Sequence, residues 1–106
     1  MAAADEFHRL MDAGHFESLY AASTPAFKAR NSSEQFVDLL SRVHTKMGAC
    51  KPAKLTKGLF RSTNRGSFGF YSYSRKCESG DLYEDFQWQI VDGNILLHSY
   101  SPKSSF

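Results

Sequence analysis

Two cysteines, Cys50 and Cys77, are the residues whose chemistry depends most clearly on their spacing. If the turn between the first two predicted strands falls on Thr63 and Asn64, the cysteines lie directly opposite each other in an antiparallel pair. Directly opposed residues have the Cβ separation that a disulfide requires. We therefore predict a disulfide between Cys50 and Cys77. The alternative is a pair of ordinary thiols in a reducing compartment.

Catalysis or ligand binding would require at least two polar groups that converge in a pocket. The strand pattern turns Glu84 toward the interior, where it could act as a pocket carboxylate near Phe70 and Trp88. We favour a solvated position near the beginning of its strand, because lone acids are seldom buried. A small-molecule pocket at Phe70, Glu84 and Trp88 is therefore the second interpretation of this region.

The histidines show no arrangement typical of a metal site. His98 falls on the predicted outer face of the sheet, without a carboxylate or nucleophile at a paired position. The other three lie in predicted helices without a histidine four residues further along: His8, His15 and His44. The cysteines are also too widely spaced for a Cys-x-x-Cys redox pair. We expect no metal and no cofactor.

The composition limits the classes of function. The chain has 106 residues, of which 42% are hydrophobic and 14% aromatic, so we expect a single folded domain over residues 1–106. A net charge of +2 is mild. The segment 71–76 interleaves aromatic and basic residues, a pattern that can hold single-stranded nucleic acid. No wider basic stripe continues from it, so we expect no nucleic-acid partner. No apolar run approaches the ~18 residues of a membrane span.

The positions of apolar residues predict the elements that hold these side chains. Helical spacing predicts helices over 4–13 and 15–22, with a bend at Gly14. Pro25 ends the second helix and can begin a further turn. A capping box at the sequence Asn-Ser-Ser-Glu-Gln begins a helix over 33–47.

From Cys50 onward the pattern has period two, which predicts four strands joined by short turns. The Asp92-Gly93 pair favours a type I′ hairpin turn. Such a meander buries one face of its sheet. The expected buried residues are Leu55, Leu59, Phe68, Phe70, Phe86, Trp88, Ile90, Ile95 and Leu97. We predict an α+β fold in which the N-terminal helices pack on one face of a four-stranded antiparallel meander sheet.

The opposite face of this sheet is rich in tyrosine and poor in charge, which is typical of interface cores. Its predicted contact residues are Tyr71, Tyr73, Gln87, Gln89, Leu96, His98 and Tyr100. This face is the predicted site of homodimerisation or of binding to a protein partner. A plain solvated sheet face is the alternative.

The order of elements and four sequence segments resemble a known superfamily. The segments are Leu10–Phe16, Ser23–Lys28, Ser33–Phe36 and Met47–Gly48. They are similar to small bacterial exported domains of unknown function with the cystatin-like, cone-shaped fold of the nuclear-transport-factor-two-like superfamily. The resemblance implies the fold and no particular chemistry, since members range from enzymes to protein-binding subunits.

Taken together, these patterns predict a small periplasmic or secreted domain that binds or assembles without catalysis. The small residues after Met1 resemble what a signal peptidase leaves behind, although a cytosolic N-terminus is nearly as compatible with them. A small-molecule-binding protein is the alternative, and an isomerase or hydrolase of the same fold is a third interpretation.

Overall fold

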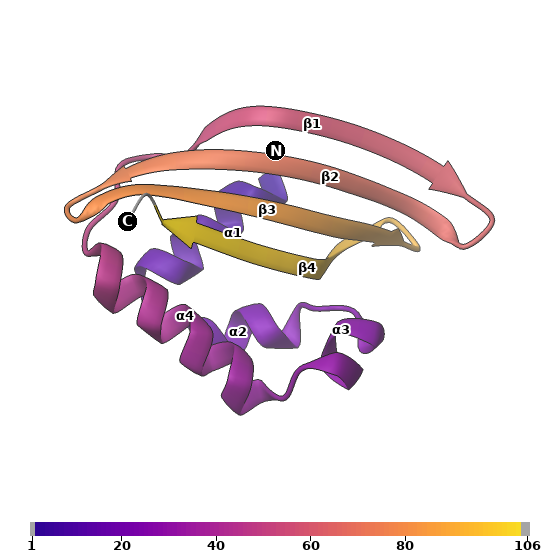
Figure 1. Cartoon of the computed structure of the whole chain (residues 1–106). Helices are drawn as coiled ribbons and strands as arrows, with labels where there is room; N and C mark the ends of the chain where they lie inside the picture. The colour runs from indigo at the N-terminus through magenta and orange to yellow at the C-terminus, as the bar shows by residue number, and fades with distance from the viewer. Residues whose placement is uncertain (1, 105–106) are drawn as a thin grey trace.

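The computed structural model describes residues 2–104 and consists of four helices followed by a four-stranded antiparallel sheet (Figure 1). All four helices lie on the same side of the sheet, so the predicted α+β fold is confirmed. The helices are α1 (Ala2–Asp12), α2 (Phe16–Ala21), α3 (Pro25–Arg30) and α4 (Ser33–Met47). The strands are β1 (Lys54–Thr63), β2 (Gly66–Cys77), β3 (Gly80–Val91) and β4 (Asn94–Ser104), paired in that order.

The three predicted helices begin and end within about two residues of the expected bounds, and the turn expected after Pro25 is the short helix α3. Gly14, with a φ of +78°, separates α1 from α2. Thr24 caps α3 by accepting a hydrogen bond from the backbone of Phe27, and Pro25 occupies its first turn. Ser32 and Gln35 form the reciprocal capping box of α4. These contacts satisfy amide groups that would otherwise lack partners.

The β3–β4 hairpin forms as predicted at its turn and departs from the prediction further along. Asp92 and Gly93 both have positive φ values, of 50° and 80°, as a type I′ turn requires. Trp88 pairs with Leu97, as expected, but Gln87 pairs with Ser99. His98 is therefore the extra residue of a β-bulge, and every residue after it faces the opposite side from the one predicted.

The face assignment of β2 was wrong, because this strand carries aromatic residues in both phases of its alternation. The turn between β2 and β3 pairs Tyr73 with Glu84 and Phe70 with Gln87. Tyr73 therefore faces the helices, with 4% of its surface exposed. Phe70 faces away from them and is 37% exposed. A shift of one residue in phase moves a whole apolar set to the other face.

The core lies between the helices and the middle of the sheet. Phe7 of α1 is its centre, with ring centroids 4.9 Å from Phe86 and 4.8 Å from Tyr100. Of the predicted buried residues, Phe86, Trp88 and Leu97 are in this core. The prediction was wrong for four residues that are exposed, namely Leu55, Leu59, Phe70 and Ile95. Phe68 and Ile90 are half-buried.

β1 forms one edge of the sheet, the edge further from α2, α3 and α4 (Figure 1). All ten of its residues are exposed. On its helix side, the ring of Tyr71 lies over Gly58 and Gly69, where a Cβ atom would come within 3.0 Å and 2.7 Å of that ring, respectively. The two glycines let one half-buried tyrosine cover this part of the sheet.

The predicted disulfide between Cys50 and Cys77 is present. The turn of the β1–β2 hairpin lies one residue later than predicted, since Thr63 pairs with Gly66. A bulge at Thr56, where the register shifts, helps to bring Cys50 back opposite Cys77. The bridge ties the segment before β1 to the end of β2, so it fastens the base of the exposed edge strand.

Candidate functional site

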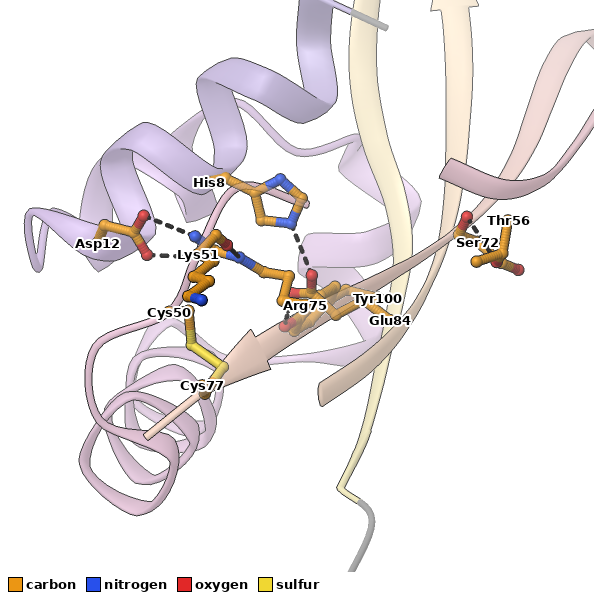
Figure 2. A network of polar contacts seen from close by, with 10 residues as sticks. All are labelled: His8, Asp12, Cys50, Lys51, Thr56, Ser72, Arg75, Cys77, Glu84 and Tyr100. Carbon is orange, nitrogen blue, oxygen red and sulfur yellow. Dashed lines mark hydrogen bonds and ion pairs between the residues drawn. A yellow bond between two sulfur atoms is a disulfide. The ribbon is translucent and has the colours of Figure 1, made fainter. Parts of the chain in front are cut away.

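A buried carboxylate, Glu84 of β3, joins a histidine and a tyrosine in the core (Figure 2). Its Oε1 atom lies 2.6 Å from Nε2 of His8 on α1. Its Oε2 atom accepts a hydrogen bond of 2.5 Å from the hydroxyl of Tyr100 on β4. Glu84 is 1% exposed, so the prediction that it occupies a solvated strand end was wrong.

Three features of the fold bring these side chains together. His8 follows Phe7 on the face of α1 that packs against the sheet, and its ring forms T-shaped contacts with Tyr73 and Phe86. Glu84 lies two residues before Phe86 and four before Trp88, so all three side chains are on the same face of β3. The bulge at His98 turns Tyr100 inward. A buried carboxylate is costly unless its oxygens are bonded, and here each oxygen has a partner.

Burial raises the pKa of Tyr100 well above its ordinary value, and the adjacent charge of Glu84 raises it further. The phenol therefore remains protonated and donates to the carboxylate. Tyr73 also has a raised pKa, chiefly because it is buried and secondarily because of the charge of Asp5.

A second polar cluster adjoins the first and the disulfide (Figure 2). Arg75, which is 4% exposed, donates two hydrogen bonds of 2.9 Å to the carboxylate oxygens of Asp12. Its Nε atom donates to the backbone carbonyl of Lys51 at 2.9 Å. A two-pronged pair of this kind fixes geometry as well as charge. It links α1 and the segment before β1 to β2.

A cleft of about 290 Å³ lies over these clusters. Its polar lining comprises Asp5, His8, Arg9, Asp12 and Arg75. An imidazole held by a carboxylate can transfer protons, and the side chain of His8 keeps 8% of its surface exposed. Glu84 and Tyr100 are sealed beneath it, and the sulfur of Cys50 is bonded to Cys77. The arrangement therefore offers the cleft a positioned imidazole beside the carboxylates of Asp5 and Asp12.

A second, apolar cleft of about 120 Å³ lies between α1, α2 and the β3–β4 hairpin, and Trp88 is part of its wall. The indole Nε1 atom of Trp88 is buried and has no hydrogen-bond partner in the described chain. Because this atom is buried, the cleft presents the ring of Trp88 rather than its Nε1 atom to a bound molecule.

The three predicted pocket residues do not form one site. Glu84 and Trp88 face inward on β3, as their alternation predicted, but Phe86 lies between them in the strand. Trp88 lines the apolar cleft and Glu84 belongs to the buried polar cluster. Phe70 lies on the opposite face of the sheet, so its inclusion in the pocket was wrong.

The predicted outer face contains only some of its predicted residues. Gln89 shares it with Leu96 and the half-buried Phe68, because it pairs with both, and Gln87 lies two residues from Gln89 on the same face. Three predicted contact residues face the helices instead, and for these the outer-face placement was wrong: Tyr71, Tyr73 and Tyr100. Whether the remaining residues of this face contact a partner stays a prediction.

The side chain of His98 on β4 contacts the segment that precedes α3. Its Nδ1 atom lies 3.0 Å from the hydroxyl of Thr24, which already accepts a hydrogen bond from the backbone of Phe27. The hydroxyl can therefore donate its proton to an unprotonated Nδ1. Burial, followed by the charge of Arg30, lowers the pKa of His98 and favours that neutral form. His98 joins the cap of α3 to the sheet.

The sequence interpretation missed His8 and Arg75 as members of the buried clusters. The inward parity of Glu84 was the one available signal, because a buried carboxylate requires hydrogen-bond donors. Within residues 2–104, no three His, Cys, Asp or Glu side chains are placed to hold a metal ion. No helix in that range is long and apolar enough to cross a membrane. No protein-family model matches the chain, and no curated protein matches it either.

Proposed function

We propose that this domain is a non-catalytic binding module whose contact surface is the exposed edge of its sheet. We name this region the β1 edge surface and define it by its apolar residues Leu55, Leu59, Phe60 and Phe70 and its cations Lys54, Lys57 and Arg61. The observation that carries the proposal is the exposure of its large apolar side chains, which reaches 56% at Phe60 and 47% at Leu59. Clustered exposed apolar groups are typical of interaction sites.

The geometry of this surface supports contact with a partner on both sides of the strand. Leu55 and Phe60 lie on the helix side of the sheet, and Leu59 and Phe70 lie on the outer side. On the outer side, a cleft of about 290 Å³ is lined in part by Lys57, Leu59 and Phe70. A partner that covered the edge of β1 would bury apolar groups on both faces at once.

The buried polar clusters support a structural role for the other polar groups. Both oxygens of Glu84 and the guanidinium of Arg75 are bonded to side chains from elements distant in the chain. Such clusters hold α1 against the sheet. Because His8, Glu84 and Tyr100 are bonded to one another inside the fold, this arrangement supports a structural role for them and agrees with the non-catalytic interpretation.

The proposal also includes an exported location and a relationship to the cystatin-like superfamily. The disulfide between Cys50 and Cys77 supports the location, since disulfides persist in oxidising compartments. The helices followed by a meander sheet support the relationship.

Replacement of Leu59 and Phe60 by glutamine tests the contact surface. Both side chains are exposed, so the double variant should fold as the wild type does. We expect a partner that co-purifies with the wild-type protein from its native host to be lost from the double variant. It should be retained by Leu39→Gln, a change of an exposed leucine on α4. Equal recovery by the double variant would place the contact elsewhere.

Small-molecule binding in the apolar cleft is a second candidate, favoured by the lining that α1, α2 and the β3–β4 hairpin give it. The side chains of Phe7, Leu10 and Leu97 would suit a short apolar group. Native mass spectrometry of the purified protein would detect a retained molecule. If Leu10→Trp, which fills the cleft, did not reduce its occupancy, the apolar cleft would not be its site.

A further inference from the structure

The two edges of the sheet are covered to different extents. Beside β4, the segment before α3 runs parallel to the strand, with a bridge between Ser23 and Leu97. The backbone amide of Thr24 donates to the carbonyl of Leu97 at 2.8 Å, and the amide of Leu97 donates to Ala22 at 3.3 Å. In the described part of the chain, β1 pairs with β2 alone and its other edge has no strand beside it.

We propose that the free edge of β1 accepts an extended, acidic segment of another protein as an additional antiparallel or parallel strand. Strand addition of this kind obtains affinity from main-chain hydrogen bonds and specificity from alternate side chains. This inference rests on the proposed function, because it specifies the partner and the binding mode of the β1 edge surface.

The charge of the β1–β2 hairpin determines the kind of partner. Residues 54–65, which form β1 and its turn, contain four Lys or Arg residues and no Asp or Glu. Three of these cations lie on β1 itself: Lys54, Lys57 and Arg61. Acidic residues opposite them would form favourable cross-strand pairs, whereas like charges placed opposite each other destabilise a sheet.

The same charges disfavour a second copy of this chain as the added strand. An antiparallel pairing of two β1 strands centred on Leu59 would place Lys57 opposite Arg61 twice. Lysine on an edge strand commonly prevents such self-association. The cations therefore disfavour self-pairing and favour an acidic segment at this edge.

The alternation along β1 also predicts the pattern of the added strand. Lys57, Leu59 and Arg61 face outward, and Gly58 and Phe60 face the helix side. Because neighbouring strands align their faces, acidic residues of the partner should face outward and apolar residues should lie beside Phe60. The expected segment therefore alternates acidic and apolar residues.

A peptide of roughly ten residues that alternates Glu and Val, about one strand in length, is the probe for this inference. Its binding is measured by fluorescence anisotropy with wild-type protein and with Lys57→Glu/Arg61→Glu. We expect at least about tenfold weaker binding by this variant, because it replaces attraction by repulsion. The matched control is Arg42→Glu/Lys103→Glu, which makes the same change in net charge on α4 and at the far end of β4. It should bind as the wild type does.

Two further peptides separate strand addition from charge attraction. N-methylation of alternate residues removes the amide donors along one edge of an extended peptide. One peptide is methylated along each edge, and the peptide whose blocked edge faces β1 should no longer bind. If both methylated peptides bind as the parent does, strand addition is wrong, although charge-dependent binding would leave the proposed contact surface standing. Absence of peptide binding, or equal binding by both charge variants, would overturn the inference. The proposed function would still be tested separately, by whether Leu59→Gln/Phe60→Gln loses the co-purifying partner.

Oligothymidylate is measured in parallel, because cations beside exposed aromatic rings also suit single-stranded nucleic acid. We expect it to bind more weakly than the acidic peptide. Tighter binding of oligothymidylate, lost in Lys57→Glu/Arg61→Glu, would show that the edge recognises a polyanion and would overturn the inference of an acidic protein segment.

Discussion

The Nε2 atom of His8 lies 2.6 Å from Oε1 of Glu84, although 76 residues separate the two in the chain. This contact ties the first helix to the third strand through the middle of the core. The other oxygen of Glu84 is occupied by Tyr100, so a single carboxylate links α1, β3 and β4. The position of α1 on the sheet therefore depends on polar geometry as well as on the packing of Phe7.

Replacement of Glu84 by alanine should destabilise the fold by about 3–5 kcal/mol, because it leaves His8 and Tyr100 buried without their acceptor. Asp85→Ala, a change of the exposed neighbour on the same strand, should cost less than about 1 kcal/mol. Urea unfolding monitored by circular dichroism measures both values. Similar losses in the two variants would show that the buried cluster contributes little. If Glu84→Ala does not fold, Tyr100→Phe should still show a loss of about 1–3 kcal/mol.

Reduction of the disulfide should lower the free energy of unfolding by about 3–4 kcal/mol, as expected for a bridge between residues 27 apart in the chain. The bridge restricts the unfolded chain and fastens the base of β1. Urea unfolding with and without reductant measures the difference. The double variant Cys50→Ser/Cys77→Ser is the control and should not respond to reductant. An unchanged midpoint for the wild type would contradict this prediction.

Stability should fall as the pH rises above about 10, the ordinary pKa of tyrosine. The pKa of Tyr100 is higher in the folded state than in the unfolded chain, so the folded state holds its proton more tightly. This contribution is fully present below the unfolded pKa and is lost as the pH rises toward the folded one. Urea midpoints between about pH 8 and 11 should fall less steeply for Tyr100→Phe than for the wild type. Tyr83→Phe, at an exposed position, should follow the wild type. Parallel curves for all three proteins would exclude the role of Tyr100.

The exposed apolar residues of β1 should contribute little to folding. In Leu59→Gln/Phe60→Gln, each of the two exposed changes should alter the free energy of unfolding by no more than about 0.5 kcal/mol. Phe7→Ala, a change in the core, should cost about 3–5 kcal/mol. A large loss in the glutamine variant would show that these side chains stabilise the fold, and their exposure would then no longer support a binding role.

Local signals in the sequence were sufficient to predict most of the fold. Gly14, Pro25 and the capping box before α4 act over a few residues, so their effects can be inferred without the tertiary structure. The Asp92-Gly93 turn likewise determines its own backbone geometry, and with it the pairing of Trp88 with Leu97. The disulfide was predicted because both cysteines lie at the base of one hairpin.

The faces of β2 and of the end of β4 could not be predicted in the same way. Tyr73 and Phe70 are both aromatic, and the choice between them depends on the register with β3. The bulge falls at His98, whose Nδ1 atom contacts Thr24, a residue distant in the chain. Tyr100 was therefore assigned to the wrong face, and its bond to Glu84 was missed. A buried polar cluster is assembled by long-range pairing, which alternation within one strand does not reveal.

Photo-crosslinking in the native host tests the central claim most directly, because it reports contact at a single residue of the folded protein. A benzoylphenylalanine placed at Phe60 should form one discrete adduct with a partner protein. The same residue placed at Leu39 on α4 should not. Loss of the Phe60 adduct in the Lys57→Glu/Arg61→Glu background would agree with the charge-dependent contact. An adduct from Leu39 and none from Phe60 would show that the partner binds the helices, and the β1 edge surface would not be the binding site.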